Sequence, residues 1–132
     1  MTRLFRSNDG YIALFTVIIV GAATMAIALT LLLTGTDVQR SALITQQSIQ
    51  ARQLANACAE EALQIIHDNT AYTGTGTLTF ETGTCSYTVS STGTSTRAVT
   101  ATGTVSSTVR KVTANVTIGA SSISVSSWQE TS

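Results

Sequence analysis

Charged residues are scarce in this chain, and neither sign dominates. They make up 11% of the 132 residues, and seven Lys and Arg balance seven Asp and Glu to a formal net charge of zero. Proteins that bind nucleic acid neutralise its phosphates with clustered Lys and Arg. The sequence offers no such cluster, so we expect no nucleic-acid partner.

Residues that commonly perform catalysis are also few. The chain has one histidine, His67, and its acids form no paired site: Glu60 and Glu61 are adjacent, and neighbours on a helix point about 100° apart. The TGTGT tract lacks the lysine and the following helix of a phosphate-binding loop. We therefore expect no enzyme active site, no metal site and no cofactor.

Charge is absent altogether from residues 10–36. The apolar run YIALFTVIIVGAATMAIALTLLL occupies Tyr11–Leu33 and would form a helix about 34 Å long, enough for a hydrocarbon core of roughly 30 Å. The alternatives are a cleaved secretory signal and the core helix of a soluble protein. A signal has a shorter apolar region, and so small a domain could not surround this helix on every side. The run therefore predicts a transmembrane helix that is not cleaved off, and we take residues 11–36 as the transmembrane segment.

The charges that flank this segment indicate its orientation. Arg3 and Arg6 closely precede it, whereas the first charges after it are Asp37 and Arg40. Because positive residues are retained on the cytoplasmic side, we expect a cytoplasmic N-terminus. Everything after Leu33 is then extracytoplasmic, in a single-pass protein of the inner or cytoplasmic membrane.

Residues 37–68 become polar but keep a helical period. Glycine and proline are missing there, and Asp68 with Asn69 disfavours helix continuation, so an amphipathic helix is predicted to end near residue 68. At the junction, Gly35 weakens a helix by about 1 kcal/mol, and Thr36 with Gln39 has capping-box spacing. The sequence leaves open whether the two helices are continuous. The expected apolar stripe comprises Val38, Ala42, Thr45, Ile49, Leu54, Ala55, Cys58, Ala62, Ile65 and Ile66.

Residues 69–132 are rich in Thr and Ser and alternate with period two. Val99, Ala101 and Val105 form one apolar face, and a second runs from Val112 to Ile118. This alternation is typical of antiparallel strands, with the Gly-Thr tracts TGTGTLTFETGT, STGTST and TATGT as turns between them. A last edge strand is expected through Ile123 and Val125, with Trp128 covering the end of the core. The asparagine of the N-x-T sequence that begins at Asn115 would accept a glycan only in a suitable host.

A sheet with one apolar face needs one covering layer, and the nearest apolar stripe is that of the preceding helix. The fold class is therefore predicted as α+β, a long N-terminal helix packed on a small antiparallel sheet. Cys58 lies on the helix stripe, and Cys85 lies with Tyr87 and Val89 on one strand face. In an oxidising compartment the two cysteines would join helix to sheet by a disulfide; in a cytosolic domain they would be buried thiols.

The basic leader, the uncharged helix, its polar continuation and the C-terminal sheet together resemble type IV pilins and pseudopilins. The residues that carry the resemblance are Arg3, Arg6, Gly10 and Tyr11. The stretch ANACAEEAL, Ala55–Leu63, is similar to the A-x-AE-x-AL pattern of minor pilins of the PilX and GspK type. The resemblance covers about the first 65 residues; the sheet resembles pilin heads only in class.

This resemblance implies that residues 1–10 are a leader, cut after Gly10 by a prepilin peptidase that then methylates Tyr11. Major pilins carry a glutamate five places into the mature chain, where this sequence has Phe15. The resemblance therefore implies a minor or tip subunit, with the membrane, the peptidase and other pilin-like subunits as partners. The small residues Gly21 and Ala22 would allow neighbouring helices to approach closely.

Two functions are compatible with these features. The first is a pilin-like structural subunit of a type IV pilus or a type II secretion-like filament, displayed at the cell surface after assembly. The alternative is a signal-anchored surface protein whose sheet binds a ligand or partner without assembling. The first predicts a cut leader, and the second predicts an intact one.

Overall fold

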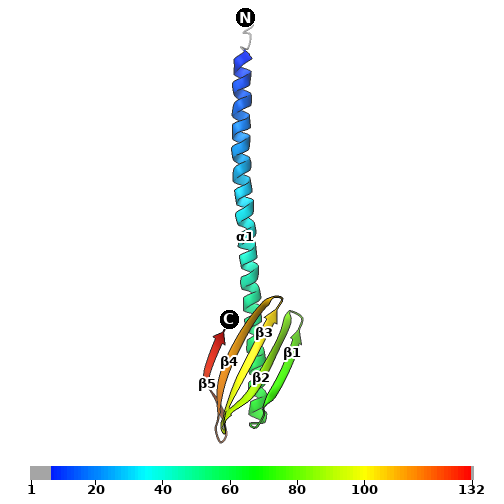
Figure 1. The fold of residues 1–132 in the computed structure, drawn as a ribbon, viewed down its shortest axis with the longest axis vertical. Helices are drawn as coiled ribbons and strands as arrows, with labels where there is room; N and C mark the ends of the chain where they lie inside the picture. The colour runs from blue at the N-terminus through cyan, green and yellow to red at the C-terminus, as the bar shows by residue number, and fades with distance from the viewer. Residues whose placement is uncertain (1–6, 132) are drawn as a thin grey trace. The chain divides into compact units, whose positions relative to one another are not determined.

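The computed structural model describes residues 7–131, so Arg3 and Arg6 of the predicted leader lie outside the described residues. One long helix precedes an antiparallel sheet, which confirms the predicted α+β class (Figure 1). The chain forms two compact units that meet between Ala42 and Leu43. We call residues 43–132 the head unit. The elements are α1 (Ser7–Asp68), β1 (Gly74–Phe80), β2 (Gly83–Gly93), β3 (Thr96–Val105), β4 (Thr108–Ile118) and β5 (Ile123–Thr131).

Helix α1 includes Gly35, so the helix does not end at the junction that the sequence left open. Thr36 does not act as a cap there, because its hydroxyl donates back to the carbonyl of Leu33 at 2.8 Å. The helix ends at Asp68, as predicted. The amide of Ala71 then donates to Oδ1 of Asn69 at 3.1 Å, an Asx-type turn that leads the chain toward β1.

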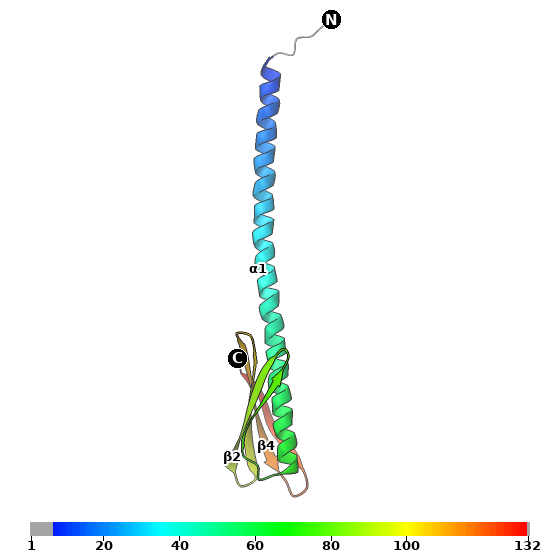
Figure 2. The same ribbon diagram turned by 90° about the vertical axis from the view of Figure 1, so that its right-hand side faces the viewer.

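The five strands form one antiparallel meander in the order β1-β2-β3-β4-β5. This confirms the strands predicted from period-two alternation, including an edge strand through Ile123 and Val125. Within the head unit, the C-terminal part of α1 lies along one face of the sheet (Figure 2). The sheet is therefore covered on one side, as an antiparallel sheet with one apolar face requires.

The core of the head unit lies between α1 and the three central strands. The stripe was predicted to begin at Val38, but Val38 and Ile49 are exposed. The prediction was wrong there because the helix residues buried in the core begin only at Ala51. The buried apolar residues are Ala51, Leu54, Ala55, Cys58, Ala59, Ala62 and Ile66 of α1, with Cys85, Tyr87, Val89, Val99, Ala101, Val105, Val112, Ala114 and Val116 of the strands.

Two of the Gly-Thr tracts lie mostly or wholly within strands, contrary to the prediction that they are turns. TGTGTLTFETGT covers β1, the turn after it and the first two residues of β2, and TATGT lies inside β3. Gly103 of β3 is buried against α1: a Cβ at this position would meet the backbone oxygen of Ala51 and lie 2.6 Å from the backbone nitrogen of Ala55. Its glycine is therefore needed for close approach of helix and sheet rather than for a turn.

Gly76 of β1 lies opposite Tyr87 of β2 and makes room for the tyrosine ring, which a Cβ at position 76 would overlap. The ring is 7% exposed and belongs to the core. Burial, followed by the neighbouring Tyr72, raises the pKa of Tyr87 above its usual value. The hydroxyl of Tyr87 therefore stays protonated at neutral pH, as a core position requires.

Trp128 does not cover the end of the core as predicted, because its side chain is 39% exposed. It lies opposite Ala114 on edge strand β5, beyond a register shift between Asn115 and Val116. None of the fully buried apolar residues comes from β5, and Ile123 of this strand is only partly buried against the core. Sequence alternation identified the strand, but it could not show how little of it the core buries.

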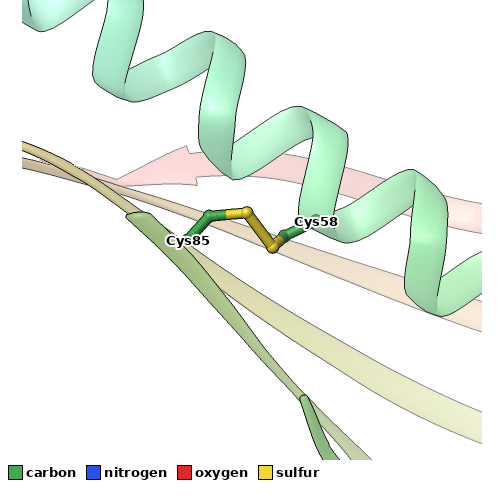
Figure 3. The surroundings of a disulfide bond; sticks show 2 residues. All are labelled: Cys58 and Cys85. Carbon is green, nitrogen blue, oxygen red and sulfur yellow. A yellow bond between two sulfur atoms is a disulfide. The ribbon is translucent and has the colours of Figure 1, made fainter. Parts of the chain in front are cut away.

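Cys58 of α1 and Cys85 of β2 form a disulfide (Figure 3). Their Cα atoms are 6.1 Å apart, and the side chains are 0% and 2% exposed. The bond connects the helix to the sheet at the centre of the core, which confirms the disulfide expected for an oxidising compartment. It also fixes which helix face meets the sheet.

The turn between β3 and β4 contains the one non-glycine residue with positive φ among the described residues, Ser106 at 54°. Side chains with a Cβ are disfavoured in this conformation, whereas glycine adopts it freely. Ser106→Gly should raise the free energy of unfolding by about 0.5 kcal/mol, since relief of local strain exceeds the added chain entropy. Thermal melting would measure the change, with Ser107→Gly as the control; a lower melting temperature for Ser106→Gly would contradict it.

Candidate functional site

The first 42 residues contain an extended apolar surface on α1. Every large apolar side chain from Tyr11 to Leu33 is more than half exposed, from 52% at Ile19 to 70% at Tyr11. Among the described residues, α1 is the one helix that is long and apolar enough to cross a membrane. Soluble proteins rarely expose so large a contiguous apolar surface. This helix is a candidate membrane span, and its surface requires a cover of lipid or protein.

The threonine hydroxyls of this apolar helix are already hydrogen-bonded within the helix. The hydroxyls of Thr16, Thr24 and Thr30 donate to the carbonyl oxygens of Ala13, Gly21 and Ile27 at 2.8–2.9 Å. Thr34 bonds back to its preceding turn in the same way. Hydroxyls that donate to carbonyls of their own helix need no hydrogen-bond partner from outside it. The segment is therefore compatible with hydrocarbon and with the apolar face of another helix.

The predicted small residues lie on this surface without internal contacts. A Cβ at Gly21 would meet nothing within 4 Å, so the chain itself does not use the missing side chain. Gly21 borders a shallow apolar depression that is also lined by Thr16, Val17 and Val20. Ala22 follows it on the helix. A neighbouring helix could place a side chain in this depression.

Gly10, Tyr11 and Phe15 lie near the start of the same helix. The cut predicted between Gly10 and Tyr11 falls inside α1, which begins at Ser7, so it coincides with no boundary between elements. The rings of Tyr11 and Phe15 are stacked, with centroids 6.4 Å apart. Both side chains are more than half exposed. The proposed role of this position comes from the resemblance, and the structure adds only the ring contact between Tyr11 and Phe15 within the described residues.

The head unit contains few groups that could perform chemistry. His67 lies at the end of α1, with Nδ1 3.4 Å from Oδ1 of Asp68, and both side chains are exposed. No group of three His, Cys, Asp or Glu in the described part of the chain could hold a metal ion. Asn115 lies on β4 with its amide donating to Oγ of Ser127 at 2.9 Å. The geometry around these residues suggests no reaction.

A basic cleft of about 330 Å³ lies where α1 meets the ends of β4 and β5. The Nε of Arg52 donates to Glu130 at 2.7 Å, and the Nε of Arg110 donates to Oγ of Ser48 at 2.9 Å. Sequence patterns marked none of Arg52, Arg110 and Glu130 as part of a site. No local signal could have united them, because the register of the sheet brings them together. The lining residues are Ser48, Arg52, Arg110, Lys111, Val112, Glu130 and Thr131.

Comparisons with protein-family models, curated proteins and solved structures found no match to this chain. The physical features of its two units are therefore the basis for a functional proposal. These features are the exposed apolar helix surface of the first unit and the one-sided, disulfide-linked head unit.

Proposed function

We propose that this chain is a pilin-like structural subunit, in a minor or tip position of a type IV pilus or a type II secretion-like filament. It is inserted as a single-pass precursor with a cytoplasmic N-terminus. A prepilin peptidase cuts the leader after Gly10, and the mature chain assembles with other pilin-like subunits. The head unit is then displayed outside the cell.

The observation that carries this proposal is the apolar surface of α1 from Tyr11 to Leu33. Its side chains are exposed and its threonine hydroxyls are paired within the helix. The same surface can be covered by lipid while the subunit is stored and by other helices after assembly, and its threonine hydroxyls stay paired in both states. A simple anchor needs only the first of these states. The unoccupied depression beside Gly21 supports the second.

Phe15 supports a minor or tip position. In the resembling family a glutamate at this place pairs with the N-terminal ammonium of the mature chain inside the filament. With Phe15 here, burial of the ammonium of Tyr11 among apolar helices would leave its charge uncompensated, which is costly. A subunit at the tip has neighbours on one side only, so its N-terminus can avoid that environment.

The mass of the protein isolated from its own cell membranes tests the proposal directly. We expect a mature chain that begins at Tyr11 and carries one added methyl group. A chain that retains the residues before Gly10 would instead favour the signal-anchored surface protein, and a chain that has lost Tyr11–Leu33 would show that the segment is a cleaved signal. Either result would contradict the proposal.

Assembly can be tested with two matched substitutions on α1. Gly21→Leu fills the depression, and we expect it to reduce the amount of protein recovered with sheared filaments by about tenfold, the equivalent of about 1.4 kcal/mol in contact energy. Ala26→Leu adds a similar volume five residues further along α1, about 140° around the helix from Gly21 and on the side away from the depression. It should retain most of the recovery, and both variants should insert into the membrane equally well. Equal recovery of the two variants would show that the Gly21 face makes no special contact.

A further inference from the structure

Positive charge in the head unit is concentrated at the basic cleft. The head unit contains Arg52, Arg97, Arg110 and Lys111 as its cations, and all but Arg97 line the cleft. Arg97 is 8% exposed and is engaged elsewhere, since it donates to the carbonyls of Gly93 and Thr96. Of the acids Glu60, Glu61, Asp68, Glu81 and Glu130, only Glu130 lines the cleft. The cleft therefore carries a net positive charge on a molecule that is neutral overall.

The two arginines of the cleft are held by their Nε atoms. Glu130 accepts from Nε of Arg52, and Ser48 accepts from Nε of Arg110. In each case the rest of the planar guanidinium remains for a ligand, and a guanidinium held in this way loses less conformational freedom when it binds. Ser48 and Arg52 are one helical turn apart, so the two arginines are anchored on the same side of α1.

The cleft also has a polar rim and a closed floor. Val112 is 1% exposed and lines the bottom, which limits access of water from the core side. Ser48 and Glu130 make the rim polar, whereas Lys111 and Thr131, which are paired across β4 and β5, alternate with Val112 and Glu130 and project from the opposite face of the sheet. Guanidinium groups recognise oxyanions through paired N–H···O bonds.

We propose that the basic cleft binds a phosphate group, with Arg52 and Arg110 as its donors. The group is either free inorganic phosphate or the phosphate of an anionic lipid headgroup. This site is independent of filament assembly, since all of its residues belong to the head unit.

The test uses the full chain in nanodiscs of phosphatidylcholine and follows the Nε–H signals of its arginines by NMR. In the first arm, inorganic phosphate is added at constant ionic strength; in the second, phosphatidylglycerol is incorporated without added phosphate. We expect saturable shifts of the Arg52 and Arg110 signals in at least one arm. Shifts in the first arm alone indicate free phosphate, and shifts in the second indicate a lipid headgroup. Chloride at the same ionic strength should leave both signals unchanged.

Arg110→Gln should weaken binding at least tenfold, whereas Arg40→Gln removes the same charge from α1 outside the head unit and should leave binding unchanged. Arg52→Gln keeps the bond between Arg110 and Ser48 and should likewise weaken binding about tenfold, so it tests the site even if Arg110→Gln disturbs the fold. The absence of saturable shifts in both arms would overturn the proposal. Equal weakening by Arg40→Gln and Arg52→Gln would also overturn it, because binding would then follow overall charge.

Discussion

Loss of the Cys58–Cys85 disulfide will lower the free energy of unfolding of the head unit by about 3.5 kcal/mol, from the chain entropy released when a loop of this length opens. The two cysteines are 27 residues apart, and both are buried at the centre of the core. The loss is important because the core is thin: its fully buried strand residues all come from the three central strands. Small domains have total stabilities of only about 5–15 kcal/mol, so this loss is a considerable part.

Guanidinium unfolding of the full chain in detergent micelles, with and without a reducing agent, measures this difference. Trp128 is the only tryptophan and reports on the head unit alone. A double variant, Cys58→Ala with Cys85→Ala, provides the control: it should be destabilised already and should not respond to the reducing agent. An unchanged unfolding midpoint on reduction of the native chain would show that the bond adds nothing to stability.

Gly103→Ala is expected to destabilise the head unit by about 2–3 kcal/mol, although alanine loses less backbone entropy than glycine when a strand forms. The added Cβ would overlap the carbonyl oxygen of Ala51 and approach the backbone nitrogen of Ala55. Both obstacles are backbone atoms, so no rotamer change can relieve the overlap. Helix α1 would have to move away from β3, which would loosen the contacts of Ala51 and Ala55 at the same time.

The matched control is Gly93→Ala at the end of β2. There the nearest atom to a new Cβ is the side-chain oxygen of Thr96, at 2.6 Å, and this oxygen can rotate away. We expect a change within about 0.5 kcal/mol in the same fluorescence-detected unfolding experiment. Equal effects of the two substitutions would mean that helix and sheet do not approach as closely at Gly103 as the structure indicates.

Sequence reasoning succeeded where the signal was local. The uncharged run Tyr11–Leu33 indicated a helix because each residue contributes its own hydrophobicity, whatever the rest of the chain does. Asp68 and Asn69 marked the end of α1 because side-chain competition for backbone groups is a local effect. Likewise, the small residues at Gly21 and Ala22 could be identified from the sequence alone. The roles of Gly10, Tyr11 and Phe15 came only from resemblance and remain part of the proposal.

Sequence reasoning failed where two distant segments had to be aligned. Gly103 was taken for a turn residue, since glycine in a Thr-rich tract satisfies the same local pattern in a turn and in a strand. The basic cleft was missed for a related reason. The cleft is formed by residues that are far apart in the chain, among them Arg52, Arg110 and Glu130. The pairing of β4 with β5, in which Val112 lies opposite Glu130, brings β5 beside the strand that carries Arg110.

The sequence by itself determined three features: the apolar run at Tyr11–Leu33, the strands after residue 68, and the inward positions of Cys58 and Cys85. It could do so because the period of the apolar residues indicates which side of each element is apolar. The tertiary structure decided how much of each apolar side is covered. In the tertiary structure the fully buried strand residues lie in β2, β3 and β4 only, Trp128 and Val38 are exposed, and Gly103 lies against the backbone of α1. How much of the sheet the helix covers depends on the width of the helix and on the register of the strands. Neither can be read from the period of a single segment.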